Sequence, residues 1–289
     1  MSQTAAPGLT EEEVARYWKD GFLVFDDVFG EEEIEALRKA CEQPQILALR
    51  SQHDYETKTV HALGITSLHP AFLELATHPA IVERIKPLLG PDIELQHSKL
   101  ATKPPAKGLG VFPWHQDYAF YPHTNTDLLS VMVMLDDATP ENGCMKMVRG
   151  SHKLGVLDHA KNGRFVAECQ ESRYWLNPEH PEDIVYITPK TGGISIHHAL
   201  TLHGSDANLS GRPRRGIVFS YRAADAYQLA DALFDDTGLM ICGTKQGVVR
   251  CDAGFVVLPN RGGDTPFGPT WNQTGPFAKS YNSARQTGM

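Results

Sequence analysis

Apolar and polar positions near the start of the chain alternate with helical spacing. Thr10 followed by Glu13 forms a capping-box pattern, and the apolar residues that come next predict an amphipathic helix over 11–19. "FLVFDDVF" (22–29) is rich in β-branched and aromatic residues, which predicts a strand. "GEEEIEALRKACEQ" (30–43) carries its apolar residues on one stripe, which predicts a second helix.

The segment "HPAFLELATHPAIVERIKPLLG" (69–90) predicts either one further helix or a pair of helices. Pro70 and Pro79 stand near helix starts, where proline is tolerated, and Gly90 stands near the end. Together with the elements before it, this segment predicts a helical N-terminal third over about residues 1–92.

From Ile93 the pattern changes to short runs of Val, Ile, Leu and aromatic residues separated by turn-forming residues. Because no helix-length segment separates most of these runs, they predict a sandwich or barrel rather than β-α-β units. The runs are "IELQHSKLAT" (93–102), "LLSVMVMLDD" (128–137), "CMKMVRGSH" (144–152), "GGISIHHALTLHG" (192–204) and "RRGIVFSYRA" (214–223). We therefore expect a single domain over 1–289, mainly β with flanking helices, with its β core over about 93–260.

Two segments fall outside this pattern. Residues 155–183 form a long polar stretch. A loop of that length in a compact domain is often a functional lid, so we expect this segment to cover a site. Residues 260–289 are rich in Gly, Pro, Asn and Ser, which predicts an extended C-terminal tail.

The composition is that of a folded globular protein, with 41% hydrophobic and 21% charged residues among 289. The net charge of −8 argues against nucleic acid as a partner, because binding to phosphates requires clustered Lys and Arg, and the only basic cluster is "GRPRRG" (211–216). No apolar run approaches the roughly 18 residues of a membrane span, and no signal peptide is evident. We expect a cytoplasmic protein with neither a membrane nor a nucleic-acid partner.

The five cysteines are an odd and widely spaced set without a C-x-x-C pair. This pattern favours reduced, buried thiols in the cytosol over a disulfide framework. They are Cys41, Cys144, Cys169, Cys242 and Cys251.

The stretch "PWHQDYAF" (113–120) places His115 and Asp117 two positions apart. On a strand, such side chains point to the same face, where one metal ion would bind both. Taken alone, an H-x-D pattern is equally met by a hydrogen-bonded surface pair, so a third ligand is needed to support a metal site.

Three histidines in "HHALTLHG", His197, His198 and His203, offer that ligand. Two imidazoles and one carboxylate that leave three coordination positions open are the ligand set of non-haem Fe(II) oxygenases. A structural zinc site would have four protein ligands, and the sequence shows no fourth candidate.

Among the three, His203 is favoured because groups able to bind a dicarboxylate follow it. Arg214 stands eleven residues further on, beyond a turn that could return it beside the metal, and its planar guanidinium suits bidentate binding of a carboxylate. Ser205 offers a hydroxyl to the same carboxylate. The alternatives are a solvated arginine in a turn and histidines on an ordinary β edge.

Four segments in order together resemble the phytanoyl-CoA dioxygenase family of Fe(II)- and 2-oxoglutarate-dependent oxygenases. They are "KPPAKGLGVFPWHQD" (103–117), "TDLLSVMVML" (126–135), "NGCMKMVRGSHK" (142–153) and "LTLHGSDANLSGRPRR" (200–215). The resemblance implies a double-stranded β-helix, or jelly roll. It further implies that the iron ligands are His115, Asp117 and His203. It implies that Arg214 anchors the distal carboxylate of 2-oxoglutarate with the help of Ser205, and that Lys99 lies near the co-substrate.

The resemblance implies that Fe(II), 2-oxoglutarate and O2 oxidise an unactivated C–H bond of a small-molecule metabolite with release of succinate and CO2, and that ascorbate supports activity. Asp117 favours hydroxylation, because related halogenases have a small residue in place of the carboxylate. Beyond the basic cluster at 211–216 no patch would hold the phosphates of CoA. Tyr118, Phe120 and Trp175 are candidate substrate residues, with packing in the core as their alternative.

Two other classes stay open from the sequence alone. One is a non-catalytic jelly roll that binds a ligand, and the other is a cupin-like enzyme that uses Zn or Mn. The sequence indicates neither the substrate nor the oligomeric state.

Overall fold

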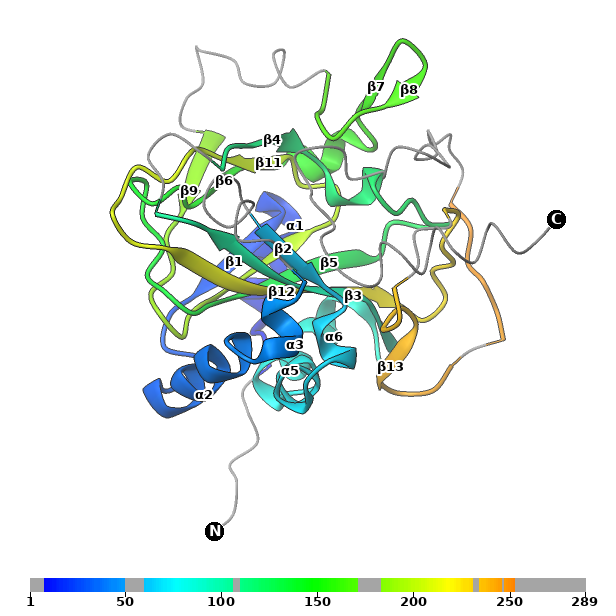
Figure 1. Ribbon diagram of the computed structural model, residues 1–289. Helices are drawn as coiled ribbons and strands as arrows, with labels where there is room; N and C mark the ends of the chain where they lie inside the picture. The colour runs from blue at the N-terminus through cyan, green and yellow to red at the C-terminus, as the bar shows by residue number, and fades with distance from the viewer. Residues whose placement is uncertain are drawn as a thin grey trace, which may run out of the picture.

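The computed structural model describes residues 8–49, 60–105, 110–170, 183–230, 234–245 and 247–252 (Figure 1). The predicted tail over 260–289 lies outside these ranges. Within them, no helix is long and apolar enough to cross a lipid bilayer.

The first helix, α1 (Glu11–Asp20), begins at the predicted capping box. The backbone N–H of Glu13 donates to Thr10 Oγ1 at 3.2 Å, and the N–H of Thr10 donates to Glu13 Oε2 at 2.8 Å. The helix ends at Gly21, whose φ of +90° suits glycine, and a Cβ there would lie 2.5 Å from His152 Nδ1.

The predicted pair of helices over 69–90 is confirmed as two helices rather than one. In both, proline occupies the first turn and the preceding histidine caps the helix: His69 Nδ1 and His78 Nδ1 each accept a backbone N–H at 3.2 Å. The helices after α1 are α2 (Glu31–Cys41), α3 (Pro44–Leu47), α5 (Pro70–Ala76) and α6 (Pro79–Leu89).

The N-terminal third is not purely helical, because two of its segments join the β core. The predicted strand at 22–29 is shorter than expected and forms β1 (Phe22–Phe25), which pairs with β10 (Ile194–His198). A strand that the sequence pattern did not predict, β2 (Val60–Leu63), pairs with β3 (Ile93–Lys103).

The five predicted β segments all form strands, and they divide between two antiparallel sheets. Among the described residues the larger sheet has the order β1-β10-β5-β12-β3-β13, with β2 also on β3, and the smaller has the order β4-β11-β6-β9. Figure 1 shows the smaller sheet above the larger one, with α2, α3, α5 and α6 below the larger. The strands not yet bounded are β4 (Phe112–His115), β5 (Leu128–Met134), β6 (Met145–Val148), β9 (Ile184–Ile187), β11 (His203–Ser205), β12 (Arg214–Ala223) and β13 (Leu239–Cys242).

The larger sheet has two chemically different faces. Because strand side chains alternate, Ile217 and Phe219 of β12 pack into the main hydrophobic core with the helices. Val218, between them, points to the opposite face and lines a cavity between the sheets. The helices therefore stabilise one face and leave the other free for a site.

The long polar segment over 155–183 contains a short hairpin of β7 (Ala160–Lys161) and β8 (Arg164–Phe165). Residues 171–182 lie outside the described ranges, so its role as a cover stays a prediction. Cys41, Cys144 and Cys169 are buried as expected. The expectation of buried thiols is wrong for Cys242, which is partly exposed, and for Cys251, which is exposed.

One buried hydrogen bond between the larger sheet and the helices gives a test of the fold. The Tyr221 hydroxyl donates to the carbonyl of Ala76, the last residue of α5, at 2.8 Å, and both residues are fully buried. Tyr221→Phe leaves this carbonyl without its donor and should lower the free energy of unfolding by about 1–2 kcal/mol in urea titration. Tyr186→Phe, at a tyrosine that is 49% exposed, is the control. Equal unfolding midpoints for the two variants would contradict this account.

Candidate metal centre and its cavity

Backbone pairing between two strands of the smaller sheet brings two histidines together. His115 ends β4 and His203 begins β11, and the two residues are cross-strand partners. Their ring centroids lie 4.2 Å apart. Residues far apart in the sequence thus meet because of strand register.

Asp117 reaches the same point, but not from the strand that the H-x-D spacing predicted. The strand ends at His115, and Asp117 begins a 3-10 helix, η2 (Asp117–Ala119), so the expectation of one shared strand face is wrong. Its Oδ1 nevertheless lies 3.7 Å from Nε2 of both His115 and His203.

The turn between the two ligands depends on Gln116, which sequence reasoning missed. Its side-chain amide is completely buried; it donates to the carbonyls of Gly155 at 2.9 Å and Leu200 at 2.8 Å. Its side-chain oxygen accepts the N–H of Leu157 at 2.8 Å. These bonds tie the turn to two other segments, and no periodicity or spacing in the sequence reveals such partners.

Both imidazoles are oriented by backbone carbonyls. His115 Nδ1 donates to Pro113 O and His203 Nδ1 donates to Thr201 O, each at 2.8 Å. With the proton on Nδ1, each Nε2 presents a lone pair toward Asp117. Burial lowers the pKa of His115 to about 4 and lowers that of His203 well below its ordinary value, so both rings are neutral, as a metal ligand requires.

The Asp117 carboxylate is held on its other side. Its Oδ2 accepts a hydrogen bond from Ser130 Oγ at 2.8 Å and lies 3.2 Å from His197 Nε2. Burial alone would raise the pKa of Asp117, but the electrostatic interaction with the His203 ring and the hydrogen bond from His197 outweigh it and hold the pKa well below its ordinary value. The carboxylate is therefore ionised.

The three histidines considered from the sequence occupy three different environments. His203 faces His115, whereas His197 contacts only the far oxygen of Asp117 and lies with its ring 4.6 Å from that of His203. His197, a candidate that was not chosen as the third ligand, therefore lies beside the site. His198 points elsewhere, against Trp18.

The donor set fits a divalent metal ion of the non-haem iron type. One ligand atom from each of His115, Asp117 and His203 lies within 4.8 Å of the other two, and all three residues are buried. Two neutral imidazoles and one carboxylate on one side of an ion leave the remaining positions open toward the cavity.

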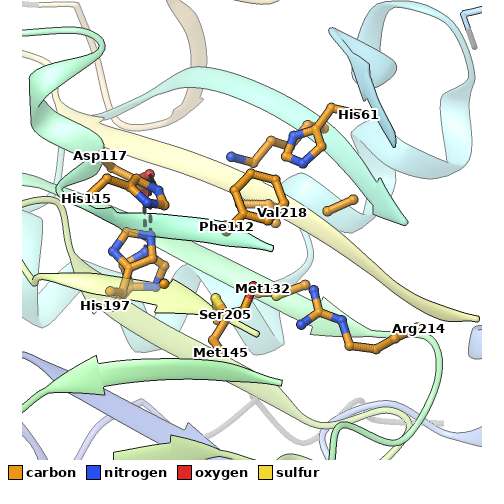
Figure 2. Close-up of a pocket in the computed structure, with 14 residues that line it drawn as sticks. His61, Phe112, His115, Asp117, Met132, Met145, His197, Ser205, Arg214 and Val218 are labelled. Carbon is orange, nitrogen blue, oxygen red and sulfur yellow. Dashed lines mark hydrogen bonds and ion pairs between the residues drawn. The ribbon is translucent and has the colours of Figure 1, made fainter. Parts of the chain in front are cut away.

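The cavity, with a volume of about 490 Å³ including the part open to solvent, is lined by the metal-ligand group and by Arg214. Figure 2 shows His115, Asp117 and His197 on one side and Arg214 on the other, with Ser205 and Met132 between them. The full lining comprises His61, Lys99, Ala101, Phe112, His115, Asp117, Met132, Met145, His197, His203, Gly204, Ser205, Arg214 and Val218.

Two buried cations line this cavity. Arg214 begins β12, and its guanidinium donates to Gly143 O at 2.8 Å; burial lowers its pKa to about 10. Burial also lowers the pKa of Lys99 to about 8, against the attraction of Asp117. Both side chains are thus largely charged at neutral pH in a site with little access to water.

Other proposed residues lie around the cavity rather than in it. Tyr118 and Phe120 are absent from its described lining and pack in a hydrophobic cluster with Phe165, although the Phe120 ring contacts that of His115 at 5.5 Å. Trp175 lies outside the described residues. Their roles in substrate binding stay predictions.

His61 lines the cavity and was missed in the sequence. It sits on β2, opposite Ala101. The strand is only four residues long, and a lone histidine in an unrecognised strand gives no signal of its surroundings.

Comparison with known proteins agrees with this geometry. The family model described as Phytanoyl-CoA dioxygenase (PhyH) matches residues 17–216. The probable alpha-ketoglutarate-dependent hypophosphite dioxygenase of Stutzerimonas stutzeri is 33% identical over 232 residues, which is 75% of this chain and 80% of that protein. The ectoine dioxygenase of Sphingopyxis alaskensis is 26% identical over 237 residues, 74% of this chain and 76% of that protein.

Solved structures share the fold. The non-heme alpha ketoglutarate dependent carbocyclase SnoK from nogalamycin biosynthesis superposes with a TM-score of 0.64 at 24% identity, over 83% of this chain and 96% of that chain. EctD from S. alaskensis with 2-oxoglutarate and 5-hydroxyectoine gives a TM-score of 0.63 at 22% identity, over 88% and 90%. The predicted jelly roll is confirmed, as are the predicted enzyme class and cofactors. The chain belongs to the phytanoyl-CoA dioxygenase family and is a 2-oxoglutarate-dependent non-haem iron dioxygenase.

Proposed function

We propose that this dioxygenase hydroxylates an unactivated C–H bond of a small molecule while 2-oxoglutarate is converted to succinate and CO2. The observation that carries the proposal is the convergence of His115, Asp117 and His203 on a cavity that also contains Arg214. These three side chains would hold Fe(II), which when bound supplies the activation of O2 and the oxidising power.

Arg214 and Ser205 are the proposed site for the distal carboxylate of 2-oxoglutarate. Both line the cavity, and the guanidinium is buried, so that an ion pair with a carboxylate would be poorly screened by water (Figure 2). Lys99, on the neighbouring strand β3, adds a second positive charge for a dianionic keto acid.

Part of the remaining lining is apolar. Phe112, Met132, Met145 and Val218 contribute apolar surface to the cavity. A dry wall strengthens the electrostatic interactions inside and protects reactive species from side reactions with solvent.

Hypophosphite is a second candidate substrate, favoured by the 33% identity to the Stutzerimonas stutzeri protein. Charge supports it: once a dianionic keto acid has bound, a divalent metal with Lys99 and Arg214 still outweighs the single carboxylate of Asp117. Such a cavity favours a small anion, whose P–H bond would be oxidised in place of a C–H bond.

Succinate formation separates these functions from the alternatives. The metal-free protein is supplied with Fe(II), ascorbate and 2-oxoglutarate, and succinate is measured across a panel of small metabolites that includes hypophosphite. We expect substrate-dependent succinate, lost by more than about 100-fold in Asp117→Ala because the carboxylate ligand is gone. Asp117→Asn, which keeps the shape, should lose activity similarly, and circular dichroism checks the fold of both.

Full activity of either Asp117 variant would remove that residue from the site. Absence of succinate across the panel would favour a jelly roll that only binds its ligand. Zn or Mn retained after anaerobic purification, with activity that needs no 2-oxoglutarate, would favour the cupin-like enzyme.

Arg214→Ala tests the site for the co-substrate. Loss of a buried, charge-assisted contact should raise the apparent KM for 2-oxoglutarate by about tenfold or more. Arg215→Ala is a matched control one residue away, because Arg215 pairs with Asp136 at 2.9 Å away from the cavity. An unchanged KM in Arg214→Ala, or an equal rise in both variants, would exclude Arg214 from this role.

A further inference from the structure

A row of polar side chains crosses the cavity-facing side of the larger sheet. His197, Ser130, Ser220 and His97 are successive cross-strand partners on β10, β5, β12 and β3. All four are buried to 2% exposure or less. Two neighbouring members of the row, His197 and Ser130, contact Asp117, the carboxylate of the proposed metal site.

The hydrogen bonds along this row have one direction. Ionised Asp117 can only accept, so Ser130 donates its single hydroxyl proton to Oδ2 at 2.8 Å. The Ser130–Ser220 contact, also 2.8 Å, must then have Ser220 as its donor. Ser220 in turn accepts from the Tyr121 hydroxyl at 3.2 Å. Every hydroxyl in the chain thus points its proton toward Asp117.

The same count of donors and acceptors determines the tautomers of two histidines. His197 Nε2, 3.2 Å from Oδ2, must carry a proton, because the carboxylate has none to give. Ser220 has already used its proton, so His97 Nε2, at 3.4 Å, is the donor in that contact. The Nδ1 of each ring has no partner among the described residues.

The two oxygens of Asp117 have different surroundings. Oδ2 receives two donors, whereas Oδ1 faces Nε2 of His115 and His203 at 3.7 Å each. We propose that the chain Tyr121–Ser220–Ser130, together with His197, holds Asp117 as a monodentate metal ligand through Oδ1. Successive hydroxyl groups polarise one another, so the outer members act through Ser130. The inference rests on the proposed metal site.

If the row served only to stabilise the fold, Ser130 would matter no more for metal binding than another buried serine of the same sheet. Burial alone does not oblige a serine on this sheet to find a partner: Ser195 on β10 is fully buried, and its hydroxyl has none in the described part of the chain. Ser195→Ala is therefore a matched control, with the same chemical change at the same burial but outside the chain of bonds.

The test is the affinity of the metal-free, full-length protein for Ni²⁺, measured by calorimetry without 2-oxoglutarate. Ser130→Ala should raise the Kd about tenfold or more, as expected for loss of a group that orients a ligand. Ser195→Ala should leave it unchanged, and thermal unfolding of the metal-free variants checks that they fold. Equal Kd values for the two variants would overturn the inference and leave the metal site intact. A wild-type protein that binds no Ni²⁺ would overturn both.

A double-mutant cycle tests whether Ser220 acts through Ser130, and its result does not depend on a single variant. Ser220→Ala should weaken Ni²⁺ binding less than Ser130→Ala does, because it acts through Ser130. In the Ser130→Ala background it should have no further effect on the Kd. Additive losses would show that Ser220 acts independently and would overturn the proposed chain.

Discussion

The site depends on the register between β4 and β11. His115 and His203 are cross-strand partners, and a slip of one residue would turn His203 to the opposite face of the strand. Gly204 permits the close approach, since a Cβ there would lie 3.0 Å from the carbonyl of Phe112. Metal–ligand bonds are only about 2 Å long, so this backbone pairing, rather than side-chain flexibility, must set the spacing of the two imidazoles.

The two faces of the larger sheet have different roles, and one of them supports Asp117, the third ligand. One face packs Ile217 and Phe219 against the helices and provides most of the burial. The other carries the polar row and the cavity. Ser130 and His197 are buried there with Asp117 Oδ2 as their shared hydrogen-bond partner. Stability and chemistry are therefore built on the same strands but on opposite sides.

Much of the fold was predictable because its signals are local. The capping box at Thr10, the prolines at Pro70 and Pro79 and the β-rich runs after Ile93 each specify an element within a few residues. The convergence of the H-x-D pair with a distant histidine was predicted from ligand chemistry and resemblance. The bend at Gln116 was not, because its three partners come from other segments.

The surroundings of Asp117 could not be predicted from the sequence for the same reason, because its partners also come from other segments. Four strands of the larger sheet, β3, β5, β10 and β12, carry a serine. Only cross-strand register distinguishes Ser130, which donates to the carboxylate, from Ser195, which has no described partner. Hydrogen-bond direction adds a second condition, because a hydroxyl has one proton and the acceptor at the end of the chain decides where each proton lies. Orientation of a metal ligand by such a chain is a property of the assembled sheet, so an equally serine-rich sequence in another register would not have it.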